Sequence, residues 1–397
     1  MSQVESRQEA LRAAETIAAQ LGKNSEEELT EASRVSALES ARKLVAALEK
    51  PQDALLRFAE SPAVWMAMRT CVELGVFAMI TESGVSAAEI AKNTGADELL
   101  IRRLLRTLTA SGFVAEQGDG LYGATPYTKH LSQRTTIGTV KFLFDMYMPI
   151  TGKAPAFLQD TSYQNPNNAK HGILQYTQQT DKEVFPWMLL PENKELFDNA
   201  QTFFEGDRGS RPSWVEWFPV QEKLLKGSSS ERPLLVDVAG GRGHDITEFH
   251  EKFPEEAGRL VLQDQQPVLE SATCLPTRIE KIPIDFYKDV PVEGSRIYFM
   301  KFVMHDYSDE DCLRIIQNVK AAMTKGYSYL VINDFILPDV GCSLLPAQWD
   351  LMMMLVMSGL ERTESQWKSL MDAAGLELEG LYQPPGDGQG IIVAKLR

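Results

Sequence analysis

Cysteine is scarce in this sequence, and its spacing excludes the usual metal and disulfide motifs. The 397 residues include Cys71, Cys274, Cys312 and Cys342, and no two of them form a Cys-x-x-Cys pair. No group of histidines and cysteines has the spacing of a zinc site either. Isolated cysteines are typical of proteins in reducing compartments. We therefore expect no metal and four buried thiols.

The sequence also lacks long apolar runs and an excess of positive charge. Its most apolar late segment, Asp350 to Met357, is far shorter than the ~20 residues that a membrane-spanning helix needs. The N-terminus, MSQVESRQEALRAAETIAAQ, has no apolar core of the signal-peptide type. A formal net charge of −15 repels phosphate backbones and anionic lipids. We expect a cytoplasmic protein that binds neither membranes nor nucleic acid.

Length and composition predict several structural units. A chain of 397 residues with 44% hydrophobic residues exceeds one ordinary domain and can bury a sizeable core. Apolar residues at helical spacing predict a helical extension over residues 1–60. A compact helical unit follows at 61–135, an aromatic-rich helical connector at 136–230 and an α/β domain at 231–397. Because the extension has no core of its own, we expect it to pack on a second subunit.

The unit at 61–135 has the pattern of a winged helix. A buried helix through WMAMRTCVELGVFAMI precedes a short helix opened by Ser86 and a third helix capped by Asp97. Gly118-Asp119-Gly120 then forms the tip of a β-hairpin. Such a unit either binds DNA through the arginines of its third helix or serves as a dimerisation platform. The acidic net charge favours the platform, so we expect a homodimer.

Residues 231–397 alternate short apolar runs with helical stretches. The runs PLLVDVAG, RLVLQD, RIYFMKF and SYLVINDF predict four strands, and DEDCLRIIQNVKAAM predicts a helix between two of them. The stretch LELEGLYQPPGDGQGIIVAKLR predicts a hairpin that closes the sheet. This alternation is typical of a doubly wound, Rossmann-like α/β domain.

A glycine-rich turn follows the first of these strands. LLVDVAG leads into Gly240-Gly241-Arg242-Gly243, where the backbone turns sharply and can approach a ligand closely. The next helix points its N-terminal amides at such a ligand, and Asp264 has the position of an acid that binds ribose hydroxyls. The turn is not Gly-x-Gly-x-x-Gly, and Asp237 lies within the strand before it. Both features favour S-adenosylmethionine over NAD. Asp285 with Phe286 suits an adenine ring, and the alternative for Asp285 is an ordinary loop acid.

With these residues in place, the sequence resembles the S-adenosylmethionine-dependent O-methyltransferases of natural-product metabolism, which include the plant caffeate type and many fungal enzymes. The matching segments keep the family's order and approximate spacing, and they cover most of residues 55–397. They are ATPYTKHL, PENKELFDNAQTF, LVDVAGGRG, VLQD, IDF, MKFVMHDYSDEDC, VINDFILPD and LERT. The resemblance implies a mostly helical winged-helix dimerisation domain and a Rossmann-like class I methyltransferase domain.

The resemblance also implies roles for individual residues. His305 matches the catalytic base, and Asp334 and Glu361 match the two acids that flank it. A neutral imidazole can take the proton of a phenol, whereas the alternative for His305 is a capping or core histidine. The implied cofactor contacts are Asp237, Gly240, Gly241, Gly243, Asp264, Asp285, Phe286 and Lys301.

Some positions depart from the family's commonest pattern. Ala239 stands where glycine is usual, Gln265-Gln266 replaces other residues, Tyr307 replaces a tryptophan and Asp334 is often glutamate. None of these changes removes a chemical group that the reaction needs.

The acceptor is expected to be a small molecule with a hydroxyl group, of aromatic or polyketide-like type. Candidates for its pocket are Phe185, Trp187, Met353 and Met354, although rings and thioethers are also typical of protein cores. The main alternative chemistry is a pericyclic reaction or a dehydration in which S-adenosylmethionine is bound but keeps its methyl group. A regulator that binds DNA is a second alternative. The intact His305 with its two acids favours methyl transfer.

Overall fold

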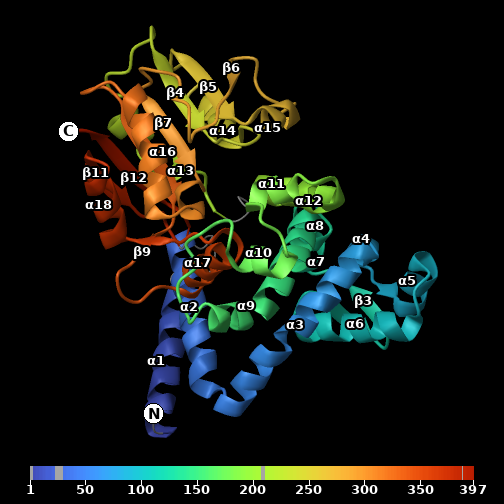
Figure 1. The fold of residues 1–397 in the computed structure, drawn as a ribbon. Helices are drawn as coiled ribbons and strands as arrows, with labels where there is room; N and C mark the ends of the chain where they lie inside the picture. The colour runs from blue at the N-terminus through green and yellow to red at the C-terminus, as the bar shows by residue number, and fades with distance from the viewer. Residues whose placement is uncertain (1–2, 23–29, 207–210, 387) are drawn as a thin grey trace. The chain divides into compact units, whose positions relative to one another are not determined.

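The computed structural model describes residues 3–22, 30–206, 211–386 and 388–397 (Figure 1). The chain divides into two compact units. One unit comprises Met1–Met148 and Pro191–Asp207, and the other comprises Pro149–Leu190 and Arg208–Arg397. None of the helices in the described ranges combines the length and the apolar character that crossing a bilayer requires.

The first unit begins with the predicted helical extension. α1 (Gln3–Leu21) packs along α2 (Glu31–Leu48), and α3 (Pro51–Glu73) follows. Thr30 caps α2 by accepting the N–H of Ser33, and Pro51 opens α3, where a missing N–H costs no helical hydrogen bond.

The rest of the first unit is small helices around a three-stranded sheet. Ser86 and Asp97 cap α5 and α6 as predicted, because their side chains accept the N–H groups of Glu89 and Leu100. The strand order is β1-β3-β2, with all pairs antiparallel. The elements are α4 (Val76–Met79), β1 (Val85–Ser86), α5 (Ala87–Thr94), α6 (Glu98–Ala110), β2 (Ala115–Gly118), β3 (Leu121–Gly123), α7 (Pro126–Leu131), α8 (Arg134–Phe142), the π-helical turn η1 (Leu143–Tyr147), the 3-10 turn η2 (Pro191–Asn193) and α12 (Lys194–Gly206).

The second unit contains a seven-stranded sheet in the order β11-β12-β8-β7-β4-β5-β6. The five strands β4 to β8 run parallel, and β12 is antiparallel to both β8 and β11. The strands are β4 (Pro233–Val238), β5 (Arg259–Asp264), β6 (Ile279–Pro283), β7 (Ile297–Lys301), β8 (Tyr329–Asp334), β11 (Leu376–Tyr382) and β12 (Gly390–Leu396). A separate parallel pair joins β9 (Ile336–Leu337) to β10 (Arg362–Thr363).

Helices cover both faces of this sheet, as a doubly wound fold requires. α16 and α18 pack on one face, and α13, α14 and α15 pack on the other. The helical segments of the unit are α9 (Met148–Asp160), α10 (Ile173–Gln178), α11 (Val184–Met188), α13 (Trp214–Trp217), η3 (Gln221–Leu225), α14 (His244–Lys252), α15 (Gln266–Ser271), η4 (Met304–Asp306), α16 (Asp309–Ala322), α17 (Leu344–Met357) and α18 (Glu364–Ala373).

Two sequence predictions need correction here. The strand β6 was not predicted, because at this sheet edge it exposes Glu280 and Lys281 and so has no apolar run. The cysteine prediction is right for Cys71 and Cys312, which are buried, and wrong for Cys274 and Cys342, which are exposed. The two exposed thiols lie in the loops before β6 and α17.

Candidate active site

The predicted site residues lie where the parallel strands end. β4 leads into the glycine turn, β5 ends at Asp264, β7 ends at Lys301 and β8 ends at Asp334. Because these strands are parallel, their carboxyl ends share one edge of the sheet. β4 and β7 are neighbours from which the chain continues in opposite directions along the sheet. Ligands of open α/β sheets bind in the crevice at such a switch point.

The glycine turn after β4 has a backbone that excludes most side chains. A Cβ on Gly240 would clash with the carboxyl group of Asp237, which is almost fully buried. Gly241 and Gly243 have φ angles of 60° and 78°, in the left-handed region that favours glycine. Ala239 also adopts this region, with φ 59°. The alanine at this position therefore carries a backbone strain that a glycine would not.

Asp264 is fixed beside the turn by backbone hydrogen bonds. Its Oδ2 accepts the N–H of Gly241 at 2.8 Å, and its Oδ1 accepts the N–H of Gln265 at 2.7 Å. Burial raises the pKa of this carboxyl, and the two N–H groups oppose that effect. The result is an immobile acid at the end of β5, with lone pairs left for further donors.

The other predicted cofactor residues border the same edge. Lys301 lies 3.4 Å from Oδ1 of Asp245, in the first turn of α14. Asp285 pairs with Lys288 at 2.5 Å, and this contact lowers the pKa of its carboxyl. The ring of Phe286 lies 6.0 Å from that of Tyr307, the residue that replaces the family's tryptophan.

His305 forms a buried pair with Glu361. It lies on η4, only 4% exposed, and its Nδ1 is 2.5 Å from Oε1 of Glu361. A carboxylate accepts, so Nδ1 carries the proton and Nε2 is the basic nitrogen of the neutral ring. The ring also stacks on Phe302, with centroids 5.1 Å apart. The pair therefore has the arrangement in which an acid orients a histidine base.

Asp334 acts on the same segment in a different way. Its Oδ1 accepts the N–H of Phe302 at 2.7 Å, and the structure records no hydrogen bond from Asp334 to His305 among the described residues. Phe302 has a φ angle of 52°, which a bulky residue rarely adopts. The carboxylate thus holds a strained backbone turn whose side chain packs on the catalytic candidate.

The electrostatics of this cluster favour a positive charge. Burial alone lowers the pKa of His305, but the charges of Glu361, Asp306 and Asp334 outweigh it and raise the pKa to about 10. Burial raises the pKa of Asp306 to about 7 and that of Asp334 to about 6. Oε2 of Glu361 and Oδ2 of Asp334 are buried and accept no hydrogen bond from any described residue. The cluster can therefore take additional hydrogen-bond donors or a cation.

The predicted acceptor residues fall into two groups. Met353 is buried and Met354 half-buried on α17, which contacts the η4 segment that carries His305. Trp187 is buried and Phe185 half-buried on α11. The structure tests no acceptor contact for any of the four, so their role stays a prediction.

Sequence reasoning did not single out four further residues of the site. These are Phe302, Asp306, Asp350 and Arg362. Asp350 accepts the N–H of Glu361 at 2.8 Å, across a sequence separation that no local pattern reveals. Arg362 did carry a signal, because it follows Glu361 in the motif LERT.

Comparison with known proteins identifies the family. An O-methyltransferase domain matches residues 217–377, and an O-methyltransferase dimerisation domain matches residues 56–134. The O-methyltransferase penC of Penicillium thymicola is 34% identical over 364 residues, which are 91% of each chain. The demethylsterigmatocystin 6-O-methyltransferase of Aspergillus flavus is 31% identical over 344 residues, 86% of this chain and 88% of that one. The chain belongs to the O-methyltransferase family.

Solved structures share the fold. LepI in complex with SAM has a TM-score of 0.88 and 30% identity, over 98% of this chain and 100% of that chain. OxaC in complex with SAH and oxaline has a TM-score of 0.85 and 25% identity, over 99% of this chain and 100% of that chain. The predicted family, fold class, enzyme class and cofactor are confirmed. The protein is an O-methyltransferase whose cofactor is S-adenosylmethionine.

Proposed function

We propose that this enzyme methylates a hydroxyl group of a small aromatic or polyketide-like secondary metabolite, with His305 as the general base. The observation that carries the proposal is the buried pair of His305 and Glu361 beside the switch point of the sheet. Nε2 of His305 is the nitrogen that takes the hydroxyl proton. Glu361 keeps the ring in that tautomer and stabilises the imidazolium that forms.

The glycine turn and Asp264 are the proposed cofactor site. Gly240, Gly241 and Gly243 leave the backbone open to a ligand, and the half-buried carboxylate of Asp264 has the place of a ribose acceptor. The proposed contacts are completed by Asp237 in β4 and, at two further strands, by Asp285 and Phe286 after β6 and by Lys301 at the end of β7. When bound, S-adenosylmethionine supplies a methyl group on a positively charged sulfur.

The charge of the site explains how His305 becomes a base at neutral pH. Three carboxylates raise the pKa of His305 to about 10, so the ring is protonated while the site holds no other cation. A positive charge brought to this sheet edge opposes the imidazolium and lowers that pKa. A bound cofactor cation would therefore favour the neutral ring, which can take the acceptor's proton.

The acceptor class is inferred from the neighbouring helix and from the relatives. α17 contributes Met353 and Met354 close to the η4 segment, and flexible thioethers adapt to flat organic molecules. We propose that Phe185 and Trp187 on α11 also contact the acceptor. The relative from Aspergillus flavus is named for methylation of demethylsterigmatocystin, and we extend an acceptor of that kind to this enzyme.

We further propose a cytoplasmic homodimer with no membrane or nucleic-acid partner. The dimerisation domain matches residues 56–134, and the first half of α3 exposes large apolar side chains. Leu55, Leu56 and Phe58 are 69%, 60% and 63% exposed. Apolar side chains gathered on one short segment are typical of a surface that a second subunit covers.

The test is methyl transfer by His305→Ala. Wild-type protein, methyl-labelled cofactor and a panel of phenols and hydroxylated polyketides are incubated, and mass spectrometry follows labelled product and S-adenosylhomocysteine. We expect the variant to lose roughly 10²-fold or more in turnover, the usual scale for a general base, and to keep its cofactor affinity. His171→Ala, at an exposed histidine of the same unit, is the matched control.

Two results would contradict the proposal. Near-normal methylation of a weakly acidic hydroxyl by His305→Ala would remove the base assignment. Product of unchanged mass, or changed only by water, without S-adenosylhomocysteine would establish the alternative chemistry instead. A structure with a TM-score of 0.88 and 28% identity is described as a pericyclic reaction enzyme, which makes this second outcome worth measuring.

A further inference from the structure

The segment after α17 is bound along the segment that carries His305. The N–H of Leu360 donates to the carbonyl oxygen of His305 at 2.9 Å. A Cβ on Gly359 would clash with that same oxygen, so the two backbones are in close contact. Glu361 then binds the His305 ring. Backbone and side chain of the proposed base are thus held by consecutive residues of the short segment between α17 and β10.

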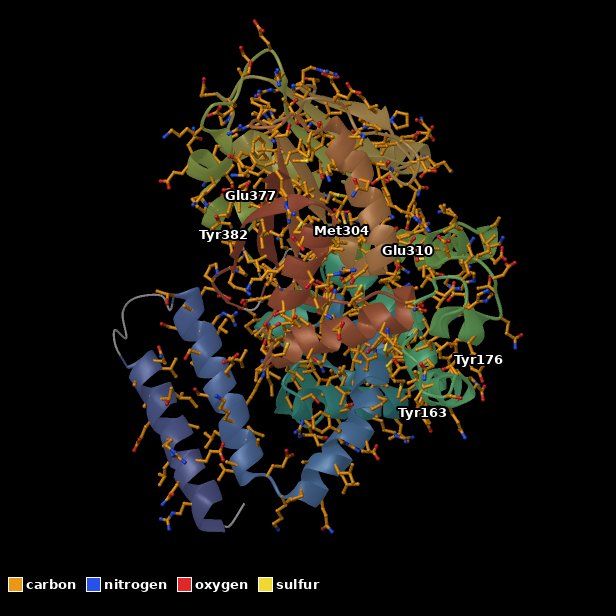
Figure 2. The ribbon with its side chains drawn as sticks, turned by 60° about the vertical axis from the view of Figure 1, so that its left-hand side comes forward. Tyr163, Tyr176, Met304, Glu310, Glu377 and Tyr382 are labelled. Atoms are coloured by element: carbon orange, nitrogen blue, oxygen red, sulfur yellow. The ribbon has the colours of Figure 1, made fainter. Side chains whose placement is uncertain are left out.

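Arg362 adds hydrogen bonds on both sides of His305. One terminal nitrogen donates to the carbonyl oxygen of Met304 at 2.8 Å, and the other donates to that of Tyr307 at 2.9 Å. Two labels in Figure 2 locate these elements: Met304 lies on η4, and Glu310 lies in the first turn of α16. The Nε atom donates to Asp309 at 2.9 Å, at the start of that helix. The guanidinium therefore joins the η4 turn to α16.

Arg362 is buried, and Asp309 is the one ion-pair partner of its charge among the described residues. It is 1% exposed, and its guanidinium lies 5.4 Å from the ring centre of Trp367. Its ion-pair partner Asp309 has a side chain that is 66% exposed. Burying a guanidinium with one solvated partner is costly. Its hydrogen bonds to the carbonyl oxygens of Met304 and Tyr307 offset this cost only while the η4 turn keeps its present shape. The carboxylates around this turn are Asp306, Asp309, Asp334, Asp350 and Glu361.

A second buried arginine of the same unit provides a comparison. Arg296 donates to the carbonyl oxygens of Leu224, Lys226 and Tyr327, and it lies over the rings of Tyr327 and Tyr329. It lies at the amino end of β7, whereas His305 follows the carboxyl end. Both arginines are buried and donate to backbone carbonyl oxygens. Arg362 binds the segment around His305, whereas Arg296 binds segments at the amino end of β7.

We propose that Arg362 is a positioning residue for His305, which holds the η4 turn so that Glu361 and the imidazole stay paired. The proposal rests on the proposed function of His305. The two can be tested separately, because the pairing of His305 with Glu361 can be measured without an acceptor and without methyl transfer.

The experiment compares Arg362→Met and Arg362→Lys with Arg296→Met. Histidine labelled with ¹³C at Cε1 is followed by NMR between pH 5 and 10, and the His305 signal is assigned by its loss in His305→Ala. In wild-type protein and in Arg296→Met we expect the His305 signal to titrate far above 6.5. In Arg362→Met we expect it to move toward the ordinary value or to broaden, with partial recovery in Arg362→Lys.

Activity is the second measurement. We expect turnover to fall roughly 10- to 100-fold in Arg362→Met, with acceptor KM and cofactor Kd within about threefold of wild type. Arg296→Met is expected to lose thermal stability and to keep turnover. Should Arg362→Met fail to fold, Asp309→Asn removes the exposed partner, and a smaller loss of turnover with a shifted His305 signal is expected.

Either of two results overturns the proposal. One is that the Arg362 variants that fold keep the His305 titration and the turnover of the wild-type protein. The other is an equal loss of turnover in Arg296→Met, which would mean that any buried arginine of this unit has the same effect. Loss of activity in His305→Ala tests the proposed function separately.

Discussion

Replacing Glu361 by glutamine tests the charge of the site while keeping its shape. Glutamine has the same length and can still accept the Nδ1–H of His305 through its amide oxygen. The substitution therefore removes the negative charge 2.5 Å from the ring and leaves the tautomer in place. Changes in His305 then report on electrostatics rather than on orientation.

The expected magnitude follows from the pKa of His305. A rise from 6.5 to about 10 favours the imidazolium by on the order of 5 kcal/mol, and Glu361 is the largest contribution to that rise. Because the folded pKa lies above the unfolded value, this stabilisation is fully present below about pH 6.5 and is lost as pH rises toward 10. We expect Glu361→Gln to cost roughly 3 kcal/mol of stability at pH 6 and much less at pH 10.

Two assays check this reasoning. Thermal denaturation at pH 6 and at pH 10 compares the variant with wild type. The acidic limb of kcat/KM against pH, which reports the free enzyme's base, should move to lower pH in the variant, because the imidazolium loses its largest stabilising charge. An equal loss of stability at both pH values, or an unshifted acidic limb, would refute the electrostatic account.

Three further predictions address the rest of the molecule. Asp264→Ala should weaken S-adenosylmethionine binding at least roughly tenfold in calorimetry, because the ribose loses its carboxylate acceptor; unchanged affinity would remove that assignment. Ala239→Val should lower the melting temperature, since a β-branched residue is strained at φ 59°, while Ala239→Gly should not lower it; the reverse order would contradict the strain. Light scattering should give twice the chain mass for wild type and a smaller mass for the double variant Leu55→Glu, Phe58→Glu; a wild-type monomer at micromolar concentration would exclude the dimer.

Local patterns in the sequence were enough to predict the class of fold and the edge of the sheet that carries the site. Apolar runs between helical stretches predicted β4, β5, β7 and β8, because a strand covered on both faces of the sheet is a nearly continuous apolar run. β6 has only one neighbour in the sheet and exposes charged side chains, so the same rule does not detect it.

The sequence by itself determined which residues carry chemistry at this edge, and the tertiary structure decided what each one contacts. The resemblance to one family predicted Glu361 and Asp334 as the two acids that flank His305, and the structure pairs Glu361 with its ring across 56 residues. That Asp334 holds the N–H of Phe302, and that Arg362 holds the turn around His305, could not be predicted from spacing. Strand ends and glycine turns follow from local periodicity and backbone freedom. The partner of a buried carboxylate or guanidinium depends on which distant segments the packed core brings within 3 Å of it.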